Sequence, residues 1–168
     1  MDAKNKHGPL KGLIVIDLTR VLAGPYASMI LSDLGARIIK VEPPLGDDSR
    51  EFSPFVNNQS AYFASLNREK ESIKLDLKSE KDKLIFDELI KNADILLENY
   101  KPGTMEKLGY GYKSLSKKYP NLIYASCSGF GQTAPWATKP AYDMIVQGMG
   151  GLMSVTGHEG QEPVRVGT

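Results

Sequence analysis

The chain has 168 residues, enough for one ordinary domain with a sizeable hydrophobic core. Its 21 Lys and Arg side chains balance 20 Asp and Glu, and the formal net charge of +1 gives no reason to expect a nucleic-acid or anionic-membrane partner. The single cysteine excludes an internal disulfide, and the two histidines argue against a histidine-based metal site.

No apolar run approaches the roughly 20 residues of a bilayer span. The polar residues 1–9 lack the apolar core of a signal peptide. We therefore expect a cytoplasmic protein in which residues 1–9 are disordered.

Residues 13–44 predict a strand, a helix and a second strand. The apolar run 13–16 is typical of a strand buried on both faces. Gly24 is the expected helix N-cap, Pro25 the first helical residue, and Gly35 the left-handed residue after the helix. The stripe expected to face the core consists of Ala27, Ile30, Leu31 and Leu34. A second strand, 38–41, then runs parallel to the first.

The remaining elements follow the same alternation. Turn formers dominate residues 45–70, which predict a long loop with a short apolar segment at 61–66, and 72–77 alternates as a half-exposed edge strand does. The later elements are a helix opened by a Ser79 and Asp82 capping box, a strand at 94–98, helical pieces at 105–108 and 112–118, a strand at 122–126, and a helix near 142–149. This order indicates an α/β fold with a parallel or mostly parallel sheet.

Ligands of such sheets bind outside the carboxyl ends of the strands. The polar side chains there are Asp17, Thr19, Arg20, Glu42, Glu98, Asn99, Ser126 and Ser128. Glu42 lies where the acidic ribose ligand of a dinucleotide-binding protein is found. However, the turn at 18–25 has one glycine where that fingerprint needs three, and Pro25 removes a backbone donor. The sequence argues against a nicotinamide dinucleotide site.

Several charged or polar residues have two interpretations. Arg20 is equally consistent with a phosphate ligand and with a surface ion pair. Lys78 and Lys107 carry the same two alternatives, and the solvated one is favoured. Asn99 either binds a base or ribose or is a turn residue.

Nucleophilic catalysis has weak support in the sequence. Residues 129–131 lack the Gly-x-Ser-x-Gly elbow, and no histidine is placed to activate Ser126 or Ser128. Cys127 is predicted to lie inside an apolar strand, as a buried, inert core residue. Asp143 lies near the start of a predicted helix, where a carboxylate favours the helix dipole.

Taken together, several segments resemble the N-terminal half of the class III CoA-transferase family, which includes formyl-CoA transferase, carnitine CoA-transferase and methylacyl-CoA racemase. The matching segments are 10–13, 17–25, 33–36, 39–44, 72–78, 93–103, 122–131, 140–143 and 150–157. They follow the order of the family and span almost the whole chain.

The resemblance implies a Rossmann-like, mostly parallel sheet that forms the N-terminal half of the family's large CoA-binding domain. It also implies transfer of CoA from an acyl-CoA to a small free carboxylic acid, with no metal, in a homodimer of interlocked chains. By position, the CoA-binding residues are Arg20, Val21, Leu22, Ala23, Leu75, Lys78, Asn99, Tyr100, Lys107 and Tyr142. Asp143 has a supporting catalytic role.

The nucleophile of the family is an aspartate, and the resemblance places it beyond Thr168. Residues 10–168 are therefore expected to be a partial large domain without the small domain. The alternatives are a non-catalytic CoA- or nucleotide-binding remnant and half of a split enzyme completed by a C-terminal partner chain. Tyr142 disfavours a racemase, since racemases carry a histidine there. Pro43 replaces the arginine that stacks on adenine in some members, and Glu69 and Glu71 add negative charge that would weaken attraction for CoA phosphates.

Overall fold

A computed structural model describes residues 7–167 of the chain. It divides into two compact units, one ending at Cys127 and the other beginning at Ser128. Residues 1–6, where most of the predicted disordered segment falls, lie outside the described residues. The extent of the expected partial domain, 10–168, remains a prediction.

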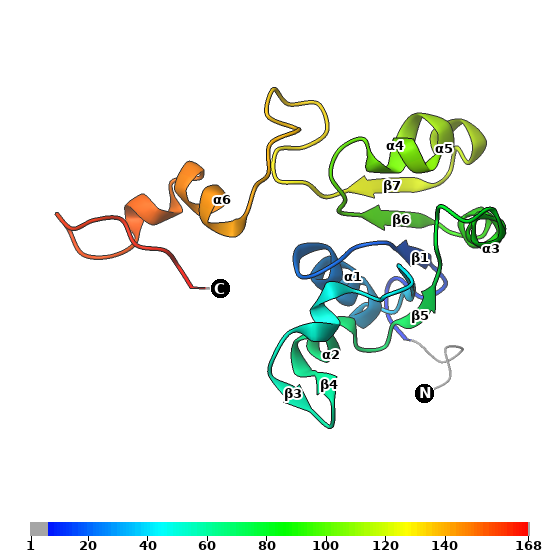
Figure 1. The fold of residues 1–168 in the computed structure, drawn as a ribbon, viewed down its shortest axis with the longest axis horizontal. Helices are drawn as coiled ribbons and strands as arrows, with labels where there is room; N and C mark the ends of the chain where they lie inside the picture. Colours follow the sequence, from blue (N-terminus) through cyan, green and yellow to red (C-terminus); the bar gives the residue numbers. More distant parts are fainter. Residues whose placement is uncertain (1–6, 168) are drawn as a thin grey trace. The chain divides into compact units, whose positions relative to one another are not determined.

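The first unit is built on a parallel sheet of five strands in the order β5-β2-β1-β6-β7 (Figure 1). The strands are β1 (Ile14–Asp17), β2 (Arg37–Glu42), β5 (Glu71–Lys74), β6 (Ile95–Glu98) and β7 (Ile123–Ser126). In the centre of the sheet, Ile16 of β1 pairs with Ile39 of β2 and with Leu96 of β6. The predicted α/β fold with a Rossmann-like parallel sheet is confirmed.

Helices cover both faces of this sheet, as the alternation of side chains along a buried strand requires. On one face, Ile16 and Leu96 pack with Phe86 and Ile90 of α3 (Glu80–Lys91). The same cluster takes in residues of α4 (Thr104–Leu108) and α5 (Tyr112–Lys118). On the other face, Val15 and Ile38 pack with residues that include Leu31 of α1 (Ala23–Asp33).

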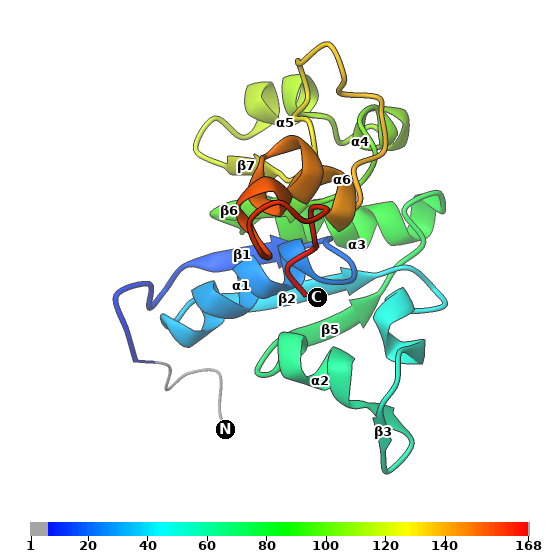
Figure 2. The same cartoon turned by 90° about the vertical axis from the view of Figure 1, so that its left-hand side faces the viewer.

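The predicted loop 45–70 contains regular structure. It forms a 3₁₀ helix η2 (Asp48–Glu51), a hairpin of β3 (Phe55–Val56) and β4 (Gln59–Ser60), and helix α2 (Ala61–Asn67). The hairpin extends away from the sheet beside α2 in both views (Figure 2). The edge position predicted for the strand at 72–77 is confirmed, but the strand, β5, ends at Lys74. Leu75 and Leu77, which follow it, are buried.

The predicted buried face of α1 is largely wrong, because only Leu31 of its four residues packs against the core. Helix α1 begins at Ala23 with Leu22 as its N-cap, so Gly24 is not the N-cap and Pro25 is the third helical residue instead of the first. Its buried side chains are those of Pro25, Ser28, Met29 and Ser32, whereas Ile30 and Leu34 are exposed. A buried carboxylate explains this orientation of α1. Asp17 at the end of β1 accepts a hydrogen bond from Ser28 Oγ at 2.5 Å, so the helix directs its small polar side chains toward the sheet. Gly35 does adopt the predicted left-handed conformation, with φ of 102°.

Two smaller predictions are also corrected. Ser79 is the N-cap of α3 but makes no side-chain capping bond, and Asp82 Oδ2 accepts from the backbone N of Asp76 at 2.8 Å. Cys127 is exposed, because it follows the last residue of β7 and does not lie within the strand.

The second unit contains helix α6 (Asp143–Met149) and the 3₁₀ helix η3 (Leu152–Val155). Asp143 is the first residue of α6, as predicted, and its Oδ2 accepts from Gln147 Nε2 at 2.6 Å. The buried Gln147 amide also exchanges two hydrogen bonds of 2.9 Å with the backbone of Val166. Over residues 7–167, the structure has no helix long and apolar enough to cross a membrane.

Candidate functional site

The carboxyl ends of β1, β2, β5 and β6 open onto a groove of about 180 Å³ in the first unit. Its lining is mostly apolar, with the exposed Lys78 adding a cation. The lining residues are Leu18, Val41, Glu42, Pro43, Pro44, Leu75, Asp76, Leu77, Lys78, Tyr100, Thr104 and Leu108. An apolar groove with a few polar groups at this edge of a parallel sheet is the arrangement expected of a ligand site.

Apart from Asn99, the predicted site residues fall into four groups. Leu75, Lys78 and Tyr100 line the groove. The stretch 20–23 forms the turn after β1 and the start of α1, next to the lining residue Leu18. Lys107 is exposed on α4, and its neighbour Leu108 lines the groove instead. Tyr142 and Asp143 belong to the second unit.

Several residues that line the groove were not predicted from the sequence. No groove-lining role was predicted for Pro43 or Pro44, although a proline pair directly after a buried strand also provides a rigid apolar surface. Thr104 and Leu108 carry no signal in the sequence, because α4 has only five residues and no clear period.

The turn after β1 is strained and held from several sides. Val21 has φ of 68°, a left-handed conformation that costs a non-glycine residue about 1–3 kcal/mol. Its backbone N donates to Asp47 Oδ1 at 3.3 Å. Asn99 binds both backbone polar groups of Arg20, the residue before Val21. Arg20 N donates to Asn99 Oδ1 at 2.9 Å, and Asn99 Nδ2 donates to Arg20 O at 2.8 Å. The side chain of Asn99 therefore shapes the turn.

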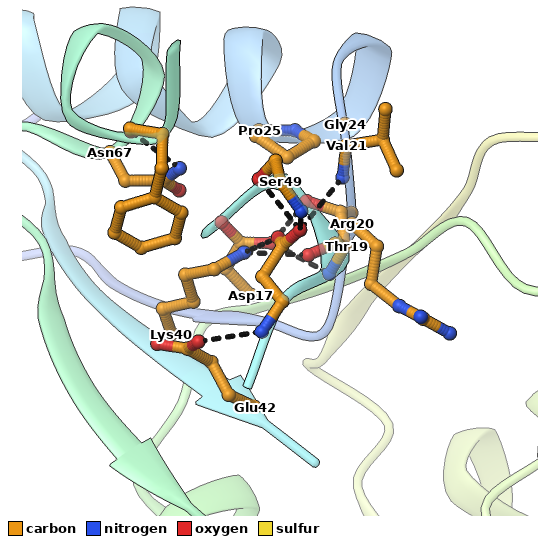
Figure 3. Close-up of polar contacts among 12 residues, drawn as sticks. Asp17, Thr19, Arg20, Val21, Gly24, Pro25, Lys40, Glu42, Ser49 and Asn67 are labelled. Carbon is orange, nitrogen blue, oxygen red and sulfur yellow. Dashed lines mark hydrogen bonds and ion pairs between the residues drawn. The ribbon is translucent and has the colours of Figure 1, made fainter. Parts of the chain in front are cut away.

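Buried ion pairs lie beneath this turn (Figure 3). Lys40 Nζ is 2.8 Å from Asp47 Oδ2, and both side chains are 1% exposed. The same ammonium donates to the carbonyl oxygen of Thr19 at 2.7 Å. Burial raises the pKa of the Asp47 carboxyl, but hydrogen bonds from Lys40 and Ser49 and the charge of Lys40 outweigh it, and the pKa is lowered overall.

A second ion pair joins β1 to the start of β5. Lys70 Nζ lies 3.2 Å from Asp17 Oδ2 and donates to Ser28 Oγ at 2.8 Å and to Pro25 O at 2.9 Å. Asp17 Oδ1 accepts from the backbone N of Thr19 at 2.8 Å. Burial lowers the pKa of the Lys70 ammonium, and the charge of Asp17 opposes this only in part.

The Glu42 carboxylate is fully engaged within the protein. It accepts Arg50 Nε at 2.7 Å, Arg50 Nη2 at 2.6 Å and Ser72 Oγ at 2.5 Å, as well as the backbone N of Asp47 at 2.9 Å. Burial opposes ionisation, but these hydrogen bonds more than offset it and lower the pKa of Glu42 to about 2. Its oxygens are therefore not directed at a ribose, which further disfavours the dinucleotide interpretation.

Arg20 forms the surface ion pair that was one of its two predicted roles, with the exposed carboxylate of Asp48. Its Nε is buried and has no hydrogen-bond partner in the structure. At the end of β6, burial raises the pKa of Glu98, whose carboxylate accepts from Ser126 Oγ and from Tyr100 N. No group of three or more His, Cys, Asp or Glu side chains able to hold a metal ion exists among residues 7–167.

The parallel sheet, the helices on both of its faces and the groove at its carboxyl edge define a Rossmann-like unit with a candidate ligand site. The profile of CoA-transferase family III matches residues 10–168, and the chain belongs to this family.

Named relatives support the assignment. Over 95% of this chain, the acetyl-CoA:oxalate CoA-transferase of Acetobacter aceti is 57% identical and the succinyl-CoA:glutarate CoA-transferase of Mus musculus is 48% identical. The solved structure of a CAIB/BAIF family protein from Brucella suis superposes with a TM-score of 0.91 over 97% of this chain, at 43% identity. The chain spans 41%, 37% and 44% of the lengths of these three relatives, respectively.

Proposed function

We propose that this chain binds the CoA moiety of an acyl-CoA, as part of an enzyme that transfers CoA to a small free carboxylic acid. The main observation in support of this proposal is the groove beside the turn after β1. It has apolar walls for a planar base and two cations, Lys78 in its lining and Arg20 in the neighbouring turn, for phosphate groups. Two of the relatives are named as CoA-transferases, for acetyl-CoA and oxalate and for succinyl-CoA and glutarate, and these names fit the same ligand.

In this proposal the base of CoA contacts Leu75 and Tyr100, and the phosphates contact Lys78, Lys107 and Arg20. A phosphate competes with Asp48 for the Arg20 guanidinium, because the two are exposed partners and Arg20 Nε is still without an acceptor. Asn99 acts by fixing the backbone of Arg20. The backbone of 20–23 then faces the pantetheine arm.

The transfer step belongs to the proposal as well. A carboxylate of the enzyme attacks the thioester carbonyl of the acyl-CoA. The C–S bond breaks, and a mixed anhydride and the CoA thiolate form. The thiolate then attacks the carbonyl of the enzyme side, which releases the acyl carboxylate and leaves the CoA on the enzyme as a thioester. The carboxylate of the acceptor acid attacks this thioester, which expels the CoA thiolate and forms a second anhydride. The thiolate then attacks the acceptor carbonyl, which gives the new acyl-CoA and releases the enzyme carboxylate. We assign Tyr142 and Asp143 a supporting place near the thioester, and the nucleophilic aspartate a position beyond Thr168.

Three further features are proposed: a location in the cytoplasm, from the sequence, and, from family membership, an interlocked homodimer and completion of the active site by residues outside this chain. The last of these fits the greater length of the relatives, since this chain spans 41% of the Acetobacter aceti enzyme.

Isothermal titration of CoA into the purified chain tests the binding proposal, with Arg20→Ala and Lys113→Ala measured beside it. Lys113 is an exposed lysine on α5 that lines no part of the groove. Loss of a charge-assisted phosphate contact is expected to weaken binding about tenfold or more in Arg20→Ala, with no change in Lys113→Ala. A folded chain that does not bind CoA would overturn the proposal.

A further inference from the structure

We propose that the buried Lys40–Asp47 ion pair positions the turn after β1 for CoA by holding Val21 in a left-handed conformation; this inference rests on the CoA-binding function proposed above. Asp47 is a positioning residue in this scheme. Its carboxylate contacts the backbone of the turn, and it does not line the groove.

Val21 is the unusual residue of the turn. Among residues 7–167, four non-glycine residues have positive φ: Val21, Asn57, Asn58 and Glu69. Asparagine tolerates this region because its side chain bonds to the local backbone, and a β-branched side chain does not. Val21 therefore needs outside contacts to keep its conformation, and strain maintained in this way is typical of binding sites.

The ion pair supplies those contacts on both sides of Arg20. Asp47 Oδ1 accepts from Val21 N at 3.3 Å, and Lys40 Nζ donates to Thr19 O at 2.7 Å. The two charged groups are 2.8 Å apart and almost completely buried, so neither is free to move away without leaving the other unpaired. Residues 19 and 21 are thus tied to one rigid pair.

The turn leads directly to the proposed site. Leu18 lines the groove just before it, and Asn99, which holds Arg20, precedes the lining residue Tyr100. If Val21 relaxed to an extended conformation, the peptide groups on either side would rotate, and Arg20 and Leu22 would move with them. The ion pair therefore acts on CoA affinity through the backbone.

A double-mutant cycle separates this role from a general effect on folding. The affinity for CoA is measured by titration for the wild type, Asp47→Ala, Val21→Gly and the double variant, with melting temperatures recorded for all. Glycine adopts positive φ without steric cost, so the turn no longer needs Asp47 in the Val21→Gly background. We expect Asp47→Ala to weaken binding about tenfold when Val21 is present and less than about threefold in the Val21→Gly background.

Two additions keep the test decisive. Asp47→Ala leaves Lys40 buried without a partner, so Lys40→Met/Asp47→Leu is measured as a second route that removes both charges and keeps the space filled. This variant is expected to fold and to show the same loss of affinity, again reduced by Val21→Gly. Glu51→Gln is the matched control, because Glu51 is an exposed carboxylate of η2 and takes no part in the hydrogen bond of Val21 N or in the ion pair of Lys40.

An equal loss of affinity in both Val21 backgrounds would show that the ion pair only stabilises the fold and would overturn the inference. Wild-type affinity in Asp47→Ala would overturn it as well. In either case CoA still binds to the wild type, and the proposed function stands. A folded wild type that does not bind CoA overturns both proposals together.

Discussion

Glu42 is expected to make a defined, acid-sensitive contribution to stability. Its side chain is 1% exposed and accepts two hydrogen bonds from Arg50 and one from Ser72. These bonds outweigh burial and lower the pKa of Glu42 from its ordinary value of 4.5 to about 2. Because the folded pKa lies below the unfolded one, the contribution is present above about pH 5 and is lost as the pH falls toward 2.

The size of this contribution follows from the two pKa values. The difference between 4.5 and about 2, at about 1.4 kcal/mol for each pH unit, gives about 3 kcal/mol at neutral pH. Of this, about 0.8 kcal/mol is lost by pH 4 and about 2 kcal/mol by pH 3. The Glu42→Gln variant lacks the titrating group, so the difference in unfolding free energy between the two proteins should shrink by these amounts.

Urea unfolding between about pH 7 and about pH 3 measures that difference directly. Glu80→Gln is the matched control, since Glu80 is 86% exposed in a surface pair with Lys83. Its difference from the wild type should stay near zero throughout. Stability curves of wild type and Glu42→Gln that run parallel from neutral to acidic pH would refute the assignment of Glu42 as a buried, ionised acceptor.

Two further predictions concern packing and accessibility. Gly24→Ala places a Cβ 2.3 Å from the Cβ of Thr19, which is held by Asp17, so we expect a loss of about 1–3 kcal/mol by urea unfolding. Gly148→Ala in α6 is its control, because the new Cβ meets only Met153 Sδ at 3.7 Å, and equal losses in the two variants would contradict this explanation. Cys127 is exposed and should react with a thiol reagent in the native protein at a rate close to that in urea; protection until unfolding would contradict its placement.

The sheet could be predicted because each of its central strands, β1, β2 and β6, is a short apolar run. Helical periodicity was a poorer guide for α1. Hydrophobic periodicity favoured Ile30 and Leu34 as the buried face, but Asp17 is buried in β1 and draws Ser28 inward by a hydrogen bond. Burial of a carboxylate depends on partners distant in sequence, here Lys70, and periodicity does not report them.

In the candidate site, too, the residues at strand ends were predicted and the buried charges were not. Strand ends were predictable, and with them Arg20 and Asn99. Lys40 was missed, although a lysine inside an apolar strand is a signal in itself: in a strand covered on both faces it needs a buried acceptor. That acceptor, Asp47, follows a turn whose course the sequence does not define, so the pair became visible only in three dimensions.

The geometry of the buried charges also explains why they are used beside a groove. A buried ion pair is seldom more stabilising than apolar side chains of the same volume, because desolvation offsets much of the attraction. Apolar side chains, however, do not direct a backbone. Here Asp17 accepts from Thr19 N and Asp47 accepts from Val21 N, while Lys40 donates to Thr19 O. Hydrogen bonds have direction, so these groups determine the conformation of the turn, and hydrophobic packing supports the sheet below it.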